Sequence, residues 1–266
     1  MPSFKYILVE HDTASGIHVC TFNRPERLNS FHEPMREEIR QFMRVVREDA
    51  GARAIIITGT GRGFCAGEDV GEMPDRTKPT SSAKDFRALA RNIHNFIDDL
   101  EDIEIPVIAA INGVCAGGGL EIALSCDFRI VAQSAKLGLP EVRVGLIPGS
   151  GGCSRLVKAI GLLRAKELVM RGTMFSAEMA ERYGLATEVV PDDQVLPRAK
   201  TLATELAQWS PAAVGLAKII IKNCANTDLE TSRNLERLAN SNLMKTPEHG
   251  EAVAAFLEKR KANFSR

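Results

Sequence analysis

The chain has 266 residues, of which 44% are apolar and 26% charged, with 34 basic and 34 acidic side chains. This is the composition of an ordinary globular protein, and a formal net charge of zero provides no general field to attract a nucleic-acid backbone. No run approaches the ~18 apolar residues that a membrane span requires. We therefore expect neither a nucleic-acid partner nor membrane insertion.

The cysteine and histidine patterns indicate no structural bridges or metal ligands. The six cysteines include no Cys-x-x-Cys pair, which argues against a disulfide framework and a structural zinc site. The five histidines show no HxxxH or HExxH spacing, so no metal is expected. The N-terminal residues carry acids early and lack the apolar core of a signal peptide, which favours a cytoplasmic protein.

The first half of the chain alternates between strand and helix patterns. Helical spacing of apolar residues predicts one helix over 34–50 and another that opens at a capping box, Ser82 with Asp85. A third helix starts in LEIALSCD, after Gly119. Strands are predicted at 5–10, 17–22, 53–58, 105–111 and 128–132. This alternation predicts an α/β fold with parallel strand pairing.

The second half of the chain is mainly helical. A short strand is predicted at 187–190, and Thr246 is the predicted N-cap of the last helix. Helices are predicted near 193–209, 211–224, 228–244 and 247–261. We expect residues 1–200 to form the core with the active site, and residues 201–266 to form a helical region whose apolar positions pack on that core or on another copy of the chain.

Two glycine-rich segments each follow an apolar strand. Residues 59–67 have GxGxG spacing instead of the dinucleotide GxGxxG, and residues 117–119 open a helix without the GK[S/T] of a phosphate loop. Glycines at such junctions expose backbone N–H groups, and two that converge form an oxyanion hole. The alternative is that these glycines only allow the strand, loop and helix to pack closely.

Two carboxylates lie near these segments in otherwise apolar surroundings. Glu121 follows the second glycine cluster, where it is either a functional group or a first-turn acid stabilised by the helix dipole. Glu141 lies in LGLPEVRVGLIPGSGG, where the alternative is a salt bridge to Arg143. Addition of water to an activated double bond requires an oxyanion hole and two such groups, one for the water and one for the α-proton.

Five ordered motifs now make a resemblance plain: the sequence is similar to the crotonase (enoyl-CoA hydratase/isomerase) superfamily over essentially its full length. The motifs are NRPERLN at 23–29, FCAGED within 61–70, GGGLE within 112–121, LPE with IPGSGG at 139–152, and EKRKANF at 258–264. The resemblance implies a spiral of ββα units with a C-terminal helical trimerisation region. It also implies a homotrimer or a dimer of trimers.

The resemblance also implies residue roles. Ala66 and Gly118 match the positions whose N–H groups bind the thioester oxygen. Glu121 matches the glutamate that deprotonates water, and Glu141 matches the one that exchanges the α-proton. The expected acyl-CoA contacts are Arg27, Leu28, Ala66, Gly67, Glu68, Asp69, Val70, Gly117, Gly118, Pro140, Gly149, Phe256 and Lys259.

Because both glutamates are present, the resemblance favours an enoyl-CoA hydratase that uses no cofactor beyond the coenzyme A of its substrate. An isomerase, or another lyase or hydrolase on the same scaffold, is the main alternative. A non-catalytic or RNA-binding homologue is the third, and the zero net charge opposes it.

Overall fold

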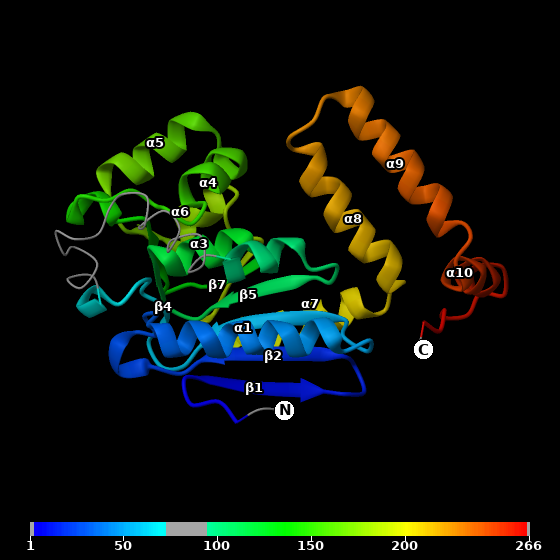
Figure 1. The fold of residues 1–266 in the computed structure, drawn as a ribbon, viewed down its shortest axis with the longest axis horizontal. Helices are drawn as coiled ribbons and strands as arrows, with labels where there is room; N and C mark the ends of the chain where they lie inside the picture. The colour runs from blue at the N-terminus through cyan, green and yellow to red at the C-terminus, as the bar shows by residue number, and fades with distance from the viewer. Residues whose placement is uncertain (1–2, 73–94, 265–266) are drawn as a thin grey trace.

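A six-stranded sheet forms the core of the computed structural model, which describes residues 3–72 and 95–264 (Figure 1). The strands are β1 (Ile7–Asp12), β2 (Ile17–Phe22), β3 (Ala54–Gly59), β5 (Val107–Ile111), β7 (Phe128–Ala132) and β10 (Glu188–Val190), in the order β1-β2-β3-β5-β7-β10. β1 and β2 pair antiparallel, and every later pair is parallel. The predicted strands and the parallel core are thereby confirmed, with ends shifted by up to two residues.

A second, four-stranded sheet consists of strands that the sequence pattern missed. They are β4 (Gly63–Cys65), β6 (Val114–Ala116), β8 (Lys136–Gly138) and β9 (Phe175–Ser176). No strand was predicted at these positions, and β4 and β6 lie within or directly before the two glycine-rich segments. Strands of three residues are too short to show a period-two pattern, and they pair through their backbones.

The two sheets are linked in a repeating way, because β3, β5 and β7 are each followed directly by a short strand of the second sheet. Cys115 of β6 lies opposite Cys65 of β4 on one side and opposite Leu137 of β8 on the other. This repeat agrees with the expected spiral of ββα units. It also brings the segments that leave β4, β6 and β8 to the same edge.

Helices cover the sheets and extend the chain beyond them. α7 packs on β3, β5 and β7. Residues 95–102 are helical and form the end of the helix predicted from residue 82; the beginning of that helix lies outside the described residues. The helices are α1 (Glu33–Glu48), α3 (Gly118–Ser125), α4 (Gly152–Ile160), α5 (Leu162–Arg171), α6 (Ala177–Arg182), α7 (Val195–Ala207), α8 (Pro211–Cys224), α9 (Leu229–Leu243) and α10 (Pro247–Leu257). None of the described helices is long and apolar enough to cross a membrane.

The last three helices project from the core, with α10 at the far end from α3 (Figure 1). The side chain of Thr246 accepts the N–H of His249, so the predicted cap is confirmed, although α10 ends at Leu257 and not at residue 261. Large apolar side chains are exposed along this region: Ile221, Leu229, Leu238, Met244, Val253, Phe256 and Leu257.

Candidate active site

Three segments meet at the edge where β4, β6 and β8 end. A Cβ atom on Gly67 would lie 2.9 Å from both the Ala116 oxygen and the Gly118 nitrogen, and one on Gly117 would lie 3.3 Å from Oε1 of Glu141. Both glycines have positive φ values, +93° and +53°, which other residues rarely adopt. The glycines therefore allow all three segments to approach one another, and the two predicted glutamates lie at this junction.

Two backbone amides are neighbours at this junction. Gly118 is the first residue of α3, so its N–H has no partner within the helix and lies at the positive end of the helix dipole. The Glu68 nitrogen lies 3.8 Å from where a Cβ on Gly118 would be. The backbone nitrogens of residues 68 and 118 therefore lie close together at the N-terminus of α3.

The prediction that Ala66 supplies an oxyanion donor is contradicted by its hydrogen bond. Its N–H donates to the Leu28 carbonyl at 2.9 Å, which joins the segment after β4 to the turn that follows η1 (Pro25–Arg27). The sequence could not show which of several consecutive amides lies beside Gly118. Only the path of the backbone decides this.

Glu121 is held in the site by backbone donors. Its side chain is buried, with the residue only 3% exposed, and Oε1 accepts the N–H groups of Ser150 at 2.7 Å and Gly152 at 2.9 Å. Gly152 is the first residue of α4, so the carboxylate also lies at the N-terminus of a second helix. Its position is thus fixed by contacts well beyond its own helical turn.

Glu141 begins the short helix η4 (Glu141–Val144) and has the opposite environment. Its Oε2 is buried and has no hydrogen-bond partner. Burial raises the pKa of Glu141 to about 7, the negative charge of Glu121 adds to the increase, and its own backbone N–H opposes it. Among the described residues no ion pair joins Glu141 to Arg143, so the salt-bridge alternative is not supported.

Both carboxylates affect the pKa of the same neighbouring group, the thiol of Cys153. Burial and the charges of both Glu121 and Glu141 raise the pKa of the Cys153 thiol, which lies on the first turn of α4. One carboxylate is stabilised by two N–H donors, and the other is poised to hold a proton near neutral pH. Such a difference is how paired carboxylates divide acid and base roles.

Two arginines that the sequence analysis overlooked hold the segment after β4. Arg36 on α1, only 1% exposed, contacts Oε1 of Glu68 at 2.7 Å and Oε2 of Glu33 at 2.8 Å. Arg24 contacts Oδ2 of Asp69 at 2.9 Å. The carboxylates of Glu68 and Asp69, predicted as acyl-CoA contacts, are therefore engaged by arginines of their own chain. No local pattern in the sequence signals these contacts, because the burial of Arg36 is set by the fold.

The remaining predicted contacts divide into two groups. Most belong to segments at the junction: Arg27, Leu28, Gly67, Val70, Gly117, Pro140 and Gly149. Phe256, 82% exposed, is in the last turn of α10, and Lys259 follows this helix, which lies well away from α3 (Figure 1). Residues 73–94, which include the predicted capping box of Ser82 and Asp85, lie outside the described residues.

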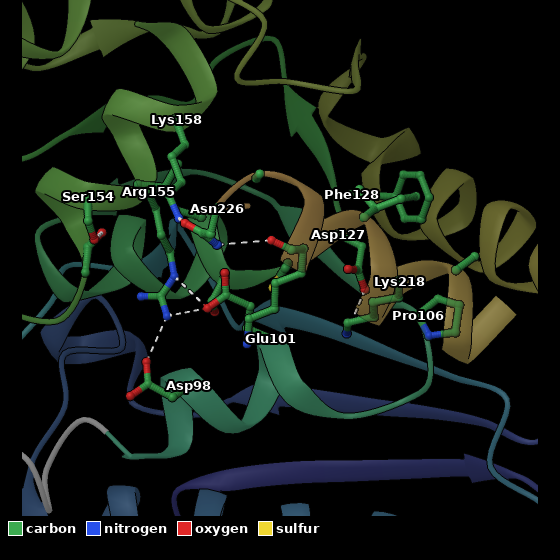
Figure 2. A pocket seen from close by; sticks show the side chains of 18 of the residues that line it. Asp98, Glu101, Pro106, Asp127, Phe128, Ser154, Arg155, Lys158, Lys218 and Asn226 are labelled. Atoms are coloured by element: carbon green, nitrogen blue, oxygen red, sulfur yellow. Dashed lines mark hydrogen bonds and ion pairs between the residues drawn. The ribbon is translucent and has the colours of Figure 1, made fainter. Parts of the chain in front are cut away.

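A cavity of about 630 Å³ lies beside the junction, between α3, α4, α8 and residues 95–102. Figure 2 shows that its charged side chains face one another in pairs, including Arg155 with Asp98 and Glu101, and Lys218 with Asp127. Neither Glu121 nor Glu141 lines it. The cavity is therefore separate from the carboxylate pair, and Arg155 and Gly151 lie in its wall.

One cluster brings together histidines that their spacing did not group. His11 and His18 lie opposite each other across β1 and β2, and both Nε2 atoms face Oδ2 of Asp49, at 3.4 Å and 2.8 Å. The rings are stacked, with centroids 3.9 Å apart and planes 9° apart. Nε2 of His18 is hydrogen-bonded to Oδ2 of Asp49, and the His11 ring stacks on the His18 imidazole, so the cluster is accounted for as a histidine–carboxylate contact.

Comparisons with known proteins agree with this geometry. The family model described as enoyl-CoA hydratase/isomerase matches residues 12–266. A crotonyl-CoA hydratase of Syntrophomonas wolfei is 35% identical over 98% of both chains, and a 1,2-epoxyphenylacetyl-CoA isomerase of Escherichia coli is 36% identical over 94% of this chain and 95% of its own. The crystal structure of an enoyl-CoA hydratase from Bacillus anthracis has a TM-score of 0.90 and 37% identity, covering 98% of this chain and 99% of its own.

Proposed function

This chain belongs to the enoyl-CoA hydratase/isomerase family, and from its site we propose that it adds water across the 2,3 double bond of an enoyl-CoA thioester to give a 3-hydroxyacyl-CoA. The observation that carries the proposal is the pairing of Glu121, bound by two N–H groups, with Glu141, whose pKa is raised to about 7.

The amides of Gly118 and Glu68 are the proposed oxyanion donors. They bind the thioester carbonyl oxygen, and the positive end of α3 adds to their effect. Negative charge grows on this oxygen as water adds, so the donors stabilise the enolate-like state more than the substrate. Loss of one such donor typically lowers the rate by about 10²–10³.

The two glutamates have separate roles in the addition of water. Glu121 accepts a proton from the water whose oxygen bonds to C3 of the acyl group. Glu141, protonated at the start, gives its proton to C2. The π electrons of the double bond form the new C2–H bond by way of the enolate, and the two carboxyl groups together end with as many protons as they began with. The chemistry requires no metal or redox cofactor.

A second reaction, isomerisation of an enoyl-CoA, is the other candidate, because the description of the matching family includes isomerases. Moving a double bond requires one group that removes and returns a proton, and Glu141 alone suffices for this. Retention of isomerase activity in Glu121→Gln, with loss in Glu141→Gln, would favour this reaction. Hydration requires both glutamates.

We further propose that the coenzyme A lies along Arg27, Leu28 and residues 67–70, and that Phe256 and Lys259 contact the coenzyme A of a neighbouring subunit. Residues 1–200 would form the catalytic core and residues 201–266 the assembly region of a homotrimer or dimer of trimers. The exposed apolar side chains of α8 to α10 support this, because such surfaces are usually covered by a partner. Light scattering tests the assembly.

A panel of enoyl-CoA thioesters of different chain length and branching tests the proposed reaction. Hydration removes the conjugated thioester chromophore, so the expected result is an enzyme-dependent loss of its absorbance for at least one member of the panel. No loss with any member would contradict the proposal.

A further inference from the structure

Arg155 lies on the first turn of α4, in the wall of the cavity of Figure 2. Its side chain is only 12% exposed, and its guanidinium donates to Oδ1 of Asp98 and Oε2 of Glu101, both at 2.8 Å. Both acids come from the helix at residues 95–102. Arg155 is thus anchored to a different part of the fold from its own helix.

The same guanidinium reaches the segment that holds Glu121. Nη1 of Arg155 donates to the Ser150 carbonyl at 2.7 Å, and the N–H of Ser150 donates in turn to Oε1 of Glu121 at 2.7 Å. Gly151 has a φ of +94°, and a Cβ there would lie 2.0 Å from Nη1 of Arg155. Residues 150–152 are therefore enclosed between the arginine on one side and the glutamate on the other.

The acids that anchor Arg155 are partly solvated, so their ion pairs contribute little net stability. The main effect of Arg155 is on geometry. Its planar guanidinium, held by several hydrogen bonds, fixes the direction of the Ser150 carbonyl. A carboxylate that must hold a water molecule in line with C3 of a substrate depends on this precision.

We propose that Arg155 is a positioning residue for Glu121, a role that rests on the hydration reaction proposed above. Arg155 fixes the Ser150 carbonyl, and the N–H groups of Ser150 and Gly152 then converge on Oε1 of Glu121. The other carboxylate oxygen is left to hold the water. Asp98 and Glu101, on the helix before β5, hold the Arg155 guanidinium in place by accepting its hydrogen bonds.

The test compares Arg155→Met with Lys158→Met. Lys158 is one turn further along α4, lines the same cavity and bonds to Asn226, without reaching residues 150–152. We expect Arg155→Met to lower kcat for hydration by up to about 10²-fold with a small change in KM, and Lys158→Met to match the wild type. Arg155→Lys, which keeps the charge and one donor, should recover part of the loss.

A second reaction distinguishes the misplacement of Glu121 from a general loss of active-site structure. Exchange of the α-protons of a saturated acyl-CoA in D2O requires the oxyanion donors and Glu141, and no attacking water. Arg155→Met should therefore keep most of its exchange activity while hydration falls. In a Glu121→Gln background, Arg155→Met should lower the residual hydration only slightly further, since the residue that it positions is already lost.

An equal fall in hydration and exchange, or the same fold-loss in both backgrounds, would overturn the positioning role. If Arg155→Met does not fold, Glu101→Gln removes one anchor, and a smaller loss confined to hydration is expected; an equal loss in both reactions would again overturn the role. A wild type that hydrates no thioester would instead contradict the proposed function itself, before any variant is compared.

Discussion

Glu121 and Glu141 lie at one site in opposite hydrogen-bond environments. Oε1 of Glu121 accepts two backbone N–H groups, whereas Oε2 of Glu141 is buried without a partner. The two N–H donors hold the Glu121 carboxyl group in place, whereas burial raises the pKa of Glu141 and favours its neutral form. This difference underlies the roles proposed for the pair.

The raised pKa of Glu141 predicts a cost in stability. The pKa of this carboxyl group is about 7 in the folded state and 4.5 in the unfolded state. The folded state therefore loses stability relative to the unfolded state as the pH rises from about 4.5 to 7. Glu141→Gln removes this cost, so the variant should be more stable than the wild type at pH 8 by on the order of 2–3 kcal/mol. Urea unfolding at pH 4.5 and 8 measures the difference, which should nearly close at the lower pH. An equal difference at both pH values would contradict the assignment.

The same group predicts the pH dependence of α-proton exchange. Only the carboxylate form of Glu141 can accept a proton, so exchange of butyryl-CoA protons in D2O should rise as pH increases through about 7. The charge of Glu121 raises the pKa of Glu141, so Glu121→Gln should move the midpoint of the rise to lower pH. NMR of the α-protons follows the reaction, and Glu141→Gln is the control that should lose it. A midpoint unchanged by Glu121→Gln would show that the two charges do not interact.

Substitutions of two adjacent glycines of α3 should have different effects on stability. A Cβ on Gly119 would lie 2.2 Å from the backbone oxygen of Cys65, which cannot move without disturbing β4. On Gly118 its nearest neighbour would be Cα of Gly67, at 3.6 Å, an ordinary contact. Gly119→Ala should therefore lower the free energy of unfolding by roughly 1–3 kcal/mol, and Gly118→Ala should change it little. Denaturation curves of the two variants make the comparison, and equal stabilities would contradict the predicted contact between α3 and β4.

The buried Arg36 predicts a large effect when it is removed alone. Arg36→Met leaves the carboxylates of Glu33 and Glu68 without this partner, and because both carboxylates are partly exposed the loss should be roughly 1–3 kcal/mol. Adding Glu68→Gln should restore part of the loss. Arg40→Met is the matched control, since Arg40 lies one turn further along α1, is more exposed and pairs with Glu33 and Glu37. Arg40→Met should change stability little, and a loss as large as that of Arg36→Met would contradict the account.

The sequence predicted the α/β core well because its long strands carry clear apolar runs. Residues 17–22 and 128–132 were placed at their observed bounds. The second sheet was missed because strands such as Gly63–Cys65 are defined only by their pairing with neighbours far along the chain. The glutamates could be identified by residue type and motif. The choice between the amides of Ala66 and Glu68, and the contacts of Arg36 and Arg155, depend on the path of the backbone and leave no local pattern.

Isotope incorporation tests the proposed reaction most directly. Crotonyl-CoA is incubated with the enzyme in D2O, and in a parallel sample in water enriched in ¹⁸O, and the products are analysed by mass spectrometry and NMR. The account predicts 3-hydroxybutyryl-CoA with one deuterium at C2 from the first sample and one ¹⁸O at C3 from the second, both formed far more slowly by Glu121→Gln. Deuterium without ¹⁸O, or a shifted double bond with no hydroxyl group, would contradict hydration.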